Sequence, residues 1–293
     1  MNDWLLFDPM FRVPFLVGLC LAAGLALVGA LLRMREEWLA ALGLSQIAAA
    51  GAIAAAPLGL PGLVGAFGAA GLAVGLRAAL PRVGNSHHAL MILTGWAGTL
   101  LIGAHIDHGQ RIGDSLLRGQ LYFTHGGHLA GSAALLLALL ALLPWLSPRL
   151  LTARFFPDYH KANRLPVWQY QIVFALLVMT ATVLGTISVG AFPAFAMLFM
   201  PSWVGFVLVD GWRRSLVASV CVGIAAYVAA FVLAMLLDLP FGPVLTGVLV
   251  LSAGLRFVTA LRRRSAELSG DNLHVNYLPP AARSRGRGGD TSG

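Results

Sequence analysis

The sequence predicts an all-α membrane protein: a polytopic transmembrane helical bundle of about nine spans, with eight as the alternative count. Three observations predict this fold. Hydrophobic residues make up 58% of the 293-residue chain, charged residues make up only 11%, and apolar runs of membrane-spanning length recur throughout it. A soluble domain carries roughly 25% charged residues. This chain has too few to cover a water-facing surface, so lipid must surround most of it.

Each apolar run is long enough to cross a bilayer as a helix. About 20 residues span a hydrocarbon core of roughly 30 Å, and a helix satisfies its own backbone there. The run 38–56 is the weakest, because it is rich in Ala and Gly, and it is the reason for the alternative count of eight. The nine runs lie at 11–32, 38–56, 58–80, 89–106, 129–150, 167–189, 191–209, 215–237 and 241–261.

The basic residues indicate how the chain is oriented. Fourteen of them lie at one set of helix ends, whereas Arg12, Arg111 and Arg118 lie at the opposite ends. Because Lys and Arg accumulate in cytoplasmic loops, the N-terminus is predicted to lie outside and the C-terminus in the cytoplasm. The formal net charge of +8 then reflects membrane topology, and nucleic acid is not an expected partner.

Composition divides the chain into two parts. Residues 1–264 contain all the predicted spans and form a transmembrane domain. Residues 265–293 are rich in Gly, Ser, Arg and Pro. Such a segment cannot bury a core, so it is predicted to be a disordered cytoplasmic tail.

The sequence lacks the motifs of nucleotide hydrolysis. The phosphate-binding pattern G-x-x-x-x-G-K-[ST] is absent, and the single lysine, Lys161, follows His160. Every Asp and Glu lies at or near a predicted helix end, whereas ion-coupled transporters usually keep ionisable residues at mid-membrane. We therefore expect no enzymatic activity. Either a partner chain supplies the energy for transport, or the protein is a channel or an accessory membrane scaffold.

A histidine-rich segment lies between the fourth and fifth predicted spans, on the outer side. His105 and His108 are three residues apart, as are His125 and His128, so each pair could share a helical face. Imidazole and carboxylate are good ligands for divalent first-row metals. The segment predicts a metal site made of His105, Asp107, His108, His125 and His128. The alternative is a polar loop that binds no metal.

Hydroxyl groups and prolines gather in the sixth and seventh predicted spans. Thr182, Thr186 and Ser188 lie in one span, and Pro201 interrupts the next. Broken helices are tolerated where backbone lines a cavity or packs on protein. We assign these four residues to a translocation pathway, with simple helix packing as the alternative.

The longest inner loop, 152–166, combines aromatic residues with mixed charges. It could be a solvated connector. It could instead form a short docking helix for a cytoplasmic partner, built on Phe156, Pro157, Asp158, Lys161 and Ala162.

Four stretches carry a resemblance to a known family. Gly190 and Pro201 resemble its spaced glycine and proline, and 238–243 resembles its Asp-x-Pro-x-Gly-Pro motif. The stretch 117–121 resembles an outer Gly-Gln-Leu turn, and 156–162 occupies the place of its ATPase-coupling loop. Over residues 8–255 the chain is similar to the permease subunits of the metal-importing, zinc and manganese, ABC transporters.

The resemblance implies the partners and the setting. A second permease copy would complete the pathway, a substrate-binding protein would deliver cargo outside, and cytoplasmic ATPase subunits would bind ATP inside. The setting would be the bacterial cytoplasmic (inner) membrane. This chain would bind no cofactor, and a zinc or manganese ion would be its cargo.

The second predicted span departs from the family pattern. The family carries Gly-Asp-x-x-x-His there, and that Asp and His are implicated in metal passage. Here Leu42 stands in place of the Asp and Gln46 in place of the His. Ser45 and Gln46 are then the polar groups that this span offers to the pathway. The fold and the coupling to ATP do not depend on this motif, and the outer histidines could compensate for its loss.

Overall fold

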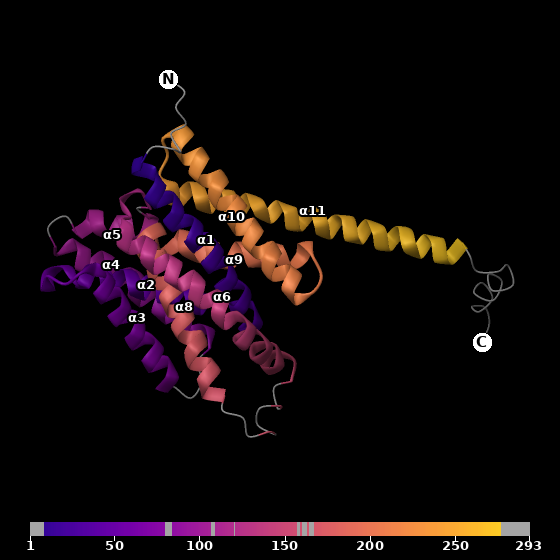
Figure 1. Ribbon diagram of the computed structural model, residues 1–293, viewed down its shortest axis with the longest axis horizontal. Helices are drawn as coiled ribbons and strands as arrows, with labels where there is room; N and C mark the ends of the chain where they lie inside the picture. The colour runs from indigo at the N-terminus through magenta and orange to yellow at the C-terminus, as the bar shows by residue number, and fades with distance from the viewer. Residues whose placement is uncertain are drawn as a thin grey trace, which may run out of the picture.

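The computed structural model describes residues 9–79, 84–106, 109–119, 121–156, 159, 163 and 167–276. These residues form α-helices and two short 3₁₀ helices, and no strand occurs among them (Figure 1). The 3₁₀ helices are η2 (Ala56–Leu58) and η3 (Leu121–Phe123). The α-helices are α1 (Pro9–Arg35), α2 (Trp38–Ala54), α3 (Gly62–Ala79), α4 (Asn85–Ala104), α5 (Gly109–Arg118), α6 (Gly126–Phe155), α8 (Val167–Val189), α9 (Ala191–Leu208), α10 (Trp212–Leu237) and α11 (Phe241–Asn276).

The predicted fold class is confirmed. Within the described residues, eight helices are long and apolar enough to cross a membrane. The ninth predicted run lies on α11, where the segment Phe241–Phe257 of the described residues is also apolar. The weakest predicted run, 38–56, falls on α2 and the start of η2 and is among the eight. The chain is thus a multi-pass helical bundle.

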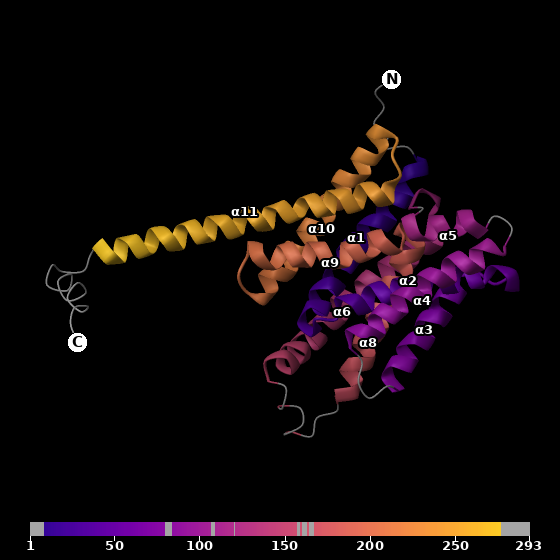
Figure 2. The same cartoon turned by 180° about the vertical axis from the view of Figure 1, so that it is seen from behind.

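Helix α1 lies at the centre of the bundle. It packs against α6, α8, α9 and α10, while α2 packs mainly against α3 and α4. Figure 2 shows the result from behind, with α3 and α4 on one side and α10 and α11 on the other. Leu21, Leu25 and Val28 are fully buried. Of the eight candidate spans, α1 has the largest share of its residues buried inside the described protein.

Small residues allow the helices to approach closely. Gly29 of α1 lies directly against the backbone carbonyl of Leu198 in α9, where a Cβ atom would overlap that oxygen. Gly95 of α4 also lies close to the backbone of α2, where a Cβ atom would overlap the carbonyl carbon of Gln46. Lipid tails are as apolar as leucine, so association in the membrane relies on such close packing rather than on the hydrophobic effect.

Three of the stretches that carry the family resemblance meet at the outer end of the bundle. Gly190 separates α8 from α9 with a φ of 103°, and its backbone lies against that of Gly119. Gly242, in the first turn of α11, lies against the carbonyl of Arg118. Asp238, with a φ of 51°, ends α10 in the left-handed conformation. The resemblance therefore rests on residues that shape the backbone.

Two features differ from the expectations. Helix α5 lies within the outer segment that the sequence analysis treated as a loop. Helix α11 continues to Asn276, so residues 265–276, predicted to be disordered, are helical. This helix extends away from the other helices (Figure 1). Residues 277–293, the rest of the predicted tail, lie outside the described residues.

Candidate functional site

The outer histidines divide into two groups. His105 ends α4, is exposed, and donates from Nδ1 to the carbonyl of Leu101 at 2.8 Å. In that tautomer Nε2 is the ring nitrogen left to bind a ligand. Asp107 and His108, the nearest other members of the predicted metal site, lie outside the described residues.

His125 and His128 come together at the start of α6. His125 is the N-cap residue, and the two rings are perpendicular with their centroids 4.3 Å apart. Nδ1 of His128 is buried and accepts or donates no hydrogen bond. Among the described residues no group of three or more His, Cys, Asp or Glu side chains converges. Of the three predicted metal ligands that the structure describes, His125 and His128 thus lie together.

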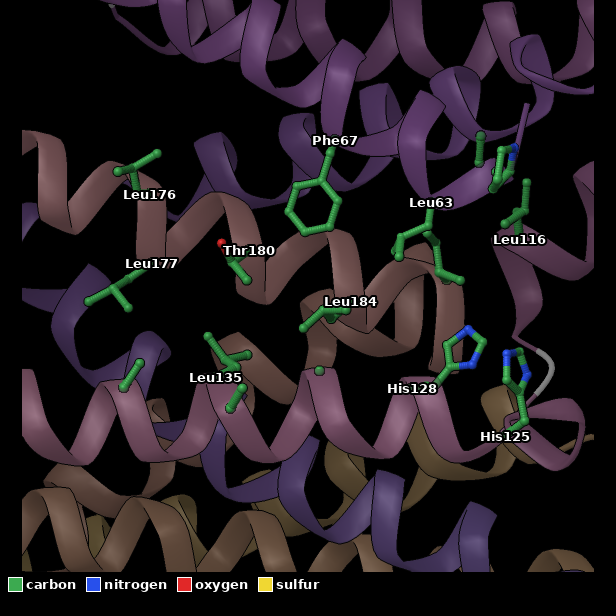
Figure 3. A pocket seen from close by; sticks show the side chains of 18 of the residues that line it. Leu63, Phe67, Leu116, His125, His128, Leu135, Leu176, Leu177, Thr180 and Leu184 are labelled. Carbon is green, nitrogen blue, oxygen red and sulfur yellow. The ribbon is translucent and has the colours of Figure 1, made fainter. Parts of the chain in front are cut away.

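A long groove extends from this histidine pair. It has a volume of about 980 Å³ and lies between α3, α5, α6 and α8. Figure 3 shows the two imidazoles at one end and apolar side chains such as Phe67, Leu135 and Leu184 along its walls. Thr180 adds a hydroxyl to the wall formed by α8. The groove therefore has imidazole nitrogens at its outer mouth, and the rest of its wall is mostly apolar.

The residues predicted to line a translocation pathway lie inside the protomer. Ser45, Gln46, Thr182, Thr186, Ser188 and Pro201 are all buried, and none of them lines the groove of Figure 3. Ser45 and Thr182 donate hydrogen bonds to carbonyls one turn earlier in their own helices, at 3.0 and 2.9 Å. Both polar atoms of Gln46 and the hydroxyl of Thr186 have no partner. Gln46 and Thr186 therefore leave unsatisfied polar atoms in the interior of the protomer.

The described part of the inner loop is small. Phe155 ends α6, and it and Phe156 are exposed. Pro157, Asp158, Lys161 and Ala162 lie outside the described residues. The prediction that this loop docks a partner therefore rests on its sequence, together with the exposure of the two phenylalanines.

Tyr122 of η3 packs against aromatic residues of α1 and α11 at the outer end of the bundle. Its ring lies 5.9 Å from that of Phe11 and 6.3 Å from that of Phe241. Burial raises the pKa of its phenol above the usual value, and the negative charge of Asp238 raises that pKa further. Tyr122 is consequently a neutral packing group at physiological pH.

The sequence analysis missed an ion-pair cluster at the opposite end of the bundle. Glu37 lies 2.8 Å from Arg77 and 3.3 Å from Arg35, and Glu36 pairs with Arg154. The signal was present in the Arg-Glu-Glu sequence between the first two spans. The arginines of this region indicate the orientation, and the two glutamates beside them are their ion-pair partners.

This combination defines a class of protein: a multi-pass membrane permease, with grooves beside its helices and ionisable groups at both ends. The chain belongs to the ABC 3 transport family, whose family model matches residues 7–261. The resemblance to an ABC permease is thus confirmed. No curated protein matches the chain.

Two solved structures share the fold. PsaBC from Streptococcus pneumoniae, in complex with Fab, matches with a TM-score of 0.76 at 17% identity. The match covers 88% of this chain and 93% of that one. An inward-facing putative metal-chelate type ABC transporter matches with a TM-score of 0.62 at 18% identity, over 86% and 85% of the two chains. At these identities the likeness concerns the fold.

Proposed function

We propose that this chain is the permease subunit of an ABC importer for a divalent first-row metal ion, zinc or manganese. The observation that carries the proposal is the pair His125 and His128 at the mouth of the groove, within a fold of the ABC 3 family. Imidazole is a common ligand for such ions, and it binds them only when it is neutral.

The histidine pair suits an ion in passage. An unpaired divalent ion entering a low-dielectric region is strongly penalised, so it needs replacement ligands when it leaves a delivery protein. Two imidazoles supply part of a coordination shell, whereas a closed four-ligand cage is typical of permanent structural sites. His105, Asp107 and His108 are the residues from which further ligands would come. Binding at this mouth should be modest and reversible.

Energy and delivery come from other chains in this proposal. Cytoplasmic ATPase subunits bind ATP and contact the loop that begins at Phe156, which is 66% exposed. A substrate-binding protein presents the ion at the outer face, and a second copy of the permease completes the pathway. The assembly lies in the bacterial cytoplasmic membrane, with the N-terminus of this chain outside.

The test is uptake into proteoliposomes. The permease and its partner ATPase would be reconstituted with ATP on the ATPase side and with the substrate-binding protein on the opposite side, and entry of zinc or manganese would be followed. The joint variant His125→Ala and His128→Ala should lose most uptake, and the joint variant His105→Ala and His108→Ala should lose less. The variant His87→Ala is the control, because His87 lies at the other end of α4.

Three results would count against the proposal. Unchanged uptake by the His125 and His128 variant would exclude the pair as a metal site. Absence of ATP-dependent uptake of either ion by wild type would exclude this cargo. Flux without ATP would indicate the alternative function, a passive channel.

A further inference from the structure

The turn between α1 and α2 carries two adjacent carboxylates that bind different helices. Glu36 pairs with Arg154 in the last turn of α6. Glu37 pairs with Arg77 in the last turn of α3, at 2.8 Å, and with Arg35 at 3.3 Å. We refer to these five residues as the inner latch. Through two consecutive residues, the latch joins the same ends of α1, α3 and α6.

The backbone at Glu36 shows that the turn is held in a particular shape. Its φ of 56° is in the left-handed region, which glycine and asparagine adopt more readily than glutamate. Glutamate is therefore less favourable than glycine or asparagine for the backbone conformation at position 36. Its carboxylate, paired with Arg154, gives the residue a role that glycine could not fill.

The two halves of the latch differ in exposure. The side chains of Glu37 and Arg77 are 20% and 27% exposed, whereas those of Glu36 and Arg154 are 66% and 43% exposed. Exposed ion pairs contribute little stability and exchange readily with water. The Glu37 half is thus the firmer part, and the Glu36 half is the part that can open and close.

The latch lies at the inner end of a series of cavities. A cavity of about 440 Å³ between α2, α3 and α8 shares Leu176 with the groove of Figure 3. A second cavity, of about 340 Å³, lies between α1, α6 and α8. Arg35 and Glu37 line both cavities, and Arg154 lines the second one. The latch consequently lies between these two cavities.

We infer that the inner latch transmits movement of the ATPase-facing loop to the α1–α2 turn and controls the inner end of the cargo route. This inference rests on the proposed function, because it needs an ATPase at the loop. Arg154 is two residues before Phe156, where that loop begins. A displacement of the loop moves Arg154, the paired Glu36 follows, and the adjacent Glu37 shifts relative to Arg35 and Arg77. In the closed arrangement these two guanidinium groups repel a cation.

The test uses the complex of permease and ATPase in proteoliposomes, supplied with the substrate-binding protein, and measures manganese moved per ATP hydrolysed. Glu36→Asn removes the carboxylate while tolerating the left-handed backbone, so it should fold at least as stably as wild type. We expect it to lower the coupling ratio about two- to fivefold, the effect of losing one exposed ion pair. Arg154→Gln should do the same, and the charge exchange Glu36→Arg with Arg154→Glu should restore coupling.

A matched control is Asp114→Asn. Asp114 forms an exposed ion pair with Arg118 on the opposite side of the bundle, at 3.8 Å, and its loss should leave the coupling ratio unchanged. Unchanged coupling in both Glu36→Asn and Arg154→Gln would overturn the inference, and so would failure of the charge exchange to restore it. If wild type moves neither manganese nor zinc, the proposed cargo fails. In that case the latch is tested by the ATPase rate of the complex. The inference requires that Glu36→Asn changes this rate and that the charge exchange restores it.

Discussion

Replacing Gln46 with methionine should stabilise the protein. Gln46 is fully buried in α2, and neither its amide nitrogen nor its amide oxygen has a hydrogen-bond partner. A buried polar group without a partner costs about 1–3 kcal/mol. Inside membranes an interhelical hydrogen bond contributes only about 0.6 kcal/mol on average, because polar groups also find partners in the unfolded state within the membrane; we take this as the lower value for each unpartnered atom. Methionine has a similar length and flexibility and carries no such group.

The magnitude follows from the two unpartnered atoms. Two groups at about 0.6–1 kcal/mol each give a gain of about 1–2 kcal/mol in the free energy of unfolding. For a chain of this size that gain raises the melting temperature by roughly 2–8 °C. The assay is thermal unfolding of the purified protein in detergent. Leu44→Met is the control, because it introduces methionine at a buried position of α2 without removing a polar group.

A lower or unchanged melting temperature for Gln46→Met would refute this reasoning, because it would mean that the amide is satisfied in the assembled protein. Uptake measured on the same variant separates two roles. If the amide contacts cargo, transport should fall although stability rises. If Gln46 only fills space, transport should remain unchanged.

Three further predictions concern other parts of the chain. Gly29→Val should destabilise the protein by about 1–3 kcal/mol in the same unfolding assay, because its side chain would overlap a backbone carbonyl of α9. Burial and Asp238 raise the pKa of Tyr122 in the folded state above its value of 10.0 in the unfolded state. The free energy of unfolding should therefore decline as pH rises past 10. The variant Tyr122→Phe should show a smaller decline between pH 9 and pH 11. A cysteine at position 110 should react with an impermeant reagent added outside intact cells, and one at position 160 should not; the reverse pattern would invert the predicted orientation.

The fold was largely predictable, because its physical cause is present in the sequence itself. Each span needs about 20 apolar residues, and the nine apolar runs fall on nine of the observed helices. Helix α5 was missed because its apolar residues do not reach spanning length. The disorder predicted from residue 265 was wrong up to Asn276, since composition alone does not show where α11 ends.

The candidate site was less predictable, because it depends on which helices meet. The spacing of His125 and His128 predicted that they share a face, and their rings do lie together. The hydroxyl groups of Thr182 and Ser188 suggested a pathway, yet they face the protein interior. The groove beside them is formed by α3, α5, α6 and α8, and no local pattern in the sequence pairs these four helices.

The family resemblance and the identity of the cargo depend on different kinds of residue. Gly119, Gly190 and Gly242 meet through backbone contacts that leave no room for a Cβ atom. Their role follows from the path of the chain and is independent of what the protein transports. Leu42 and Gln46, at the positions where the resemblance predicts an Asp and a His, lie within the regular helix α2. A permease of this fold can therefore keep its architecture while its cargo-binding groups change, and in the proposed function those groups include the imidazoles of His125 and His128 at the start of α6.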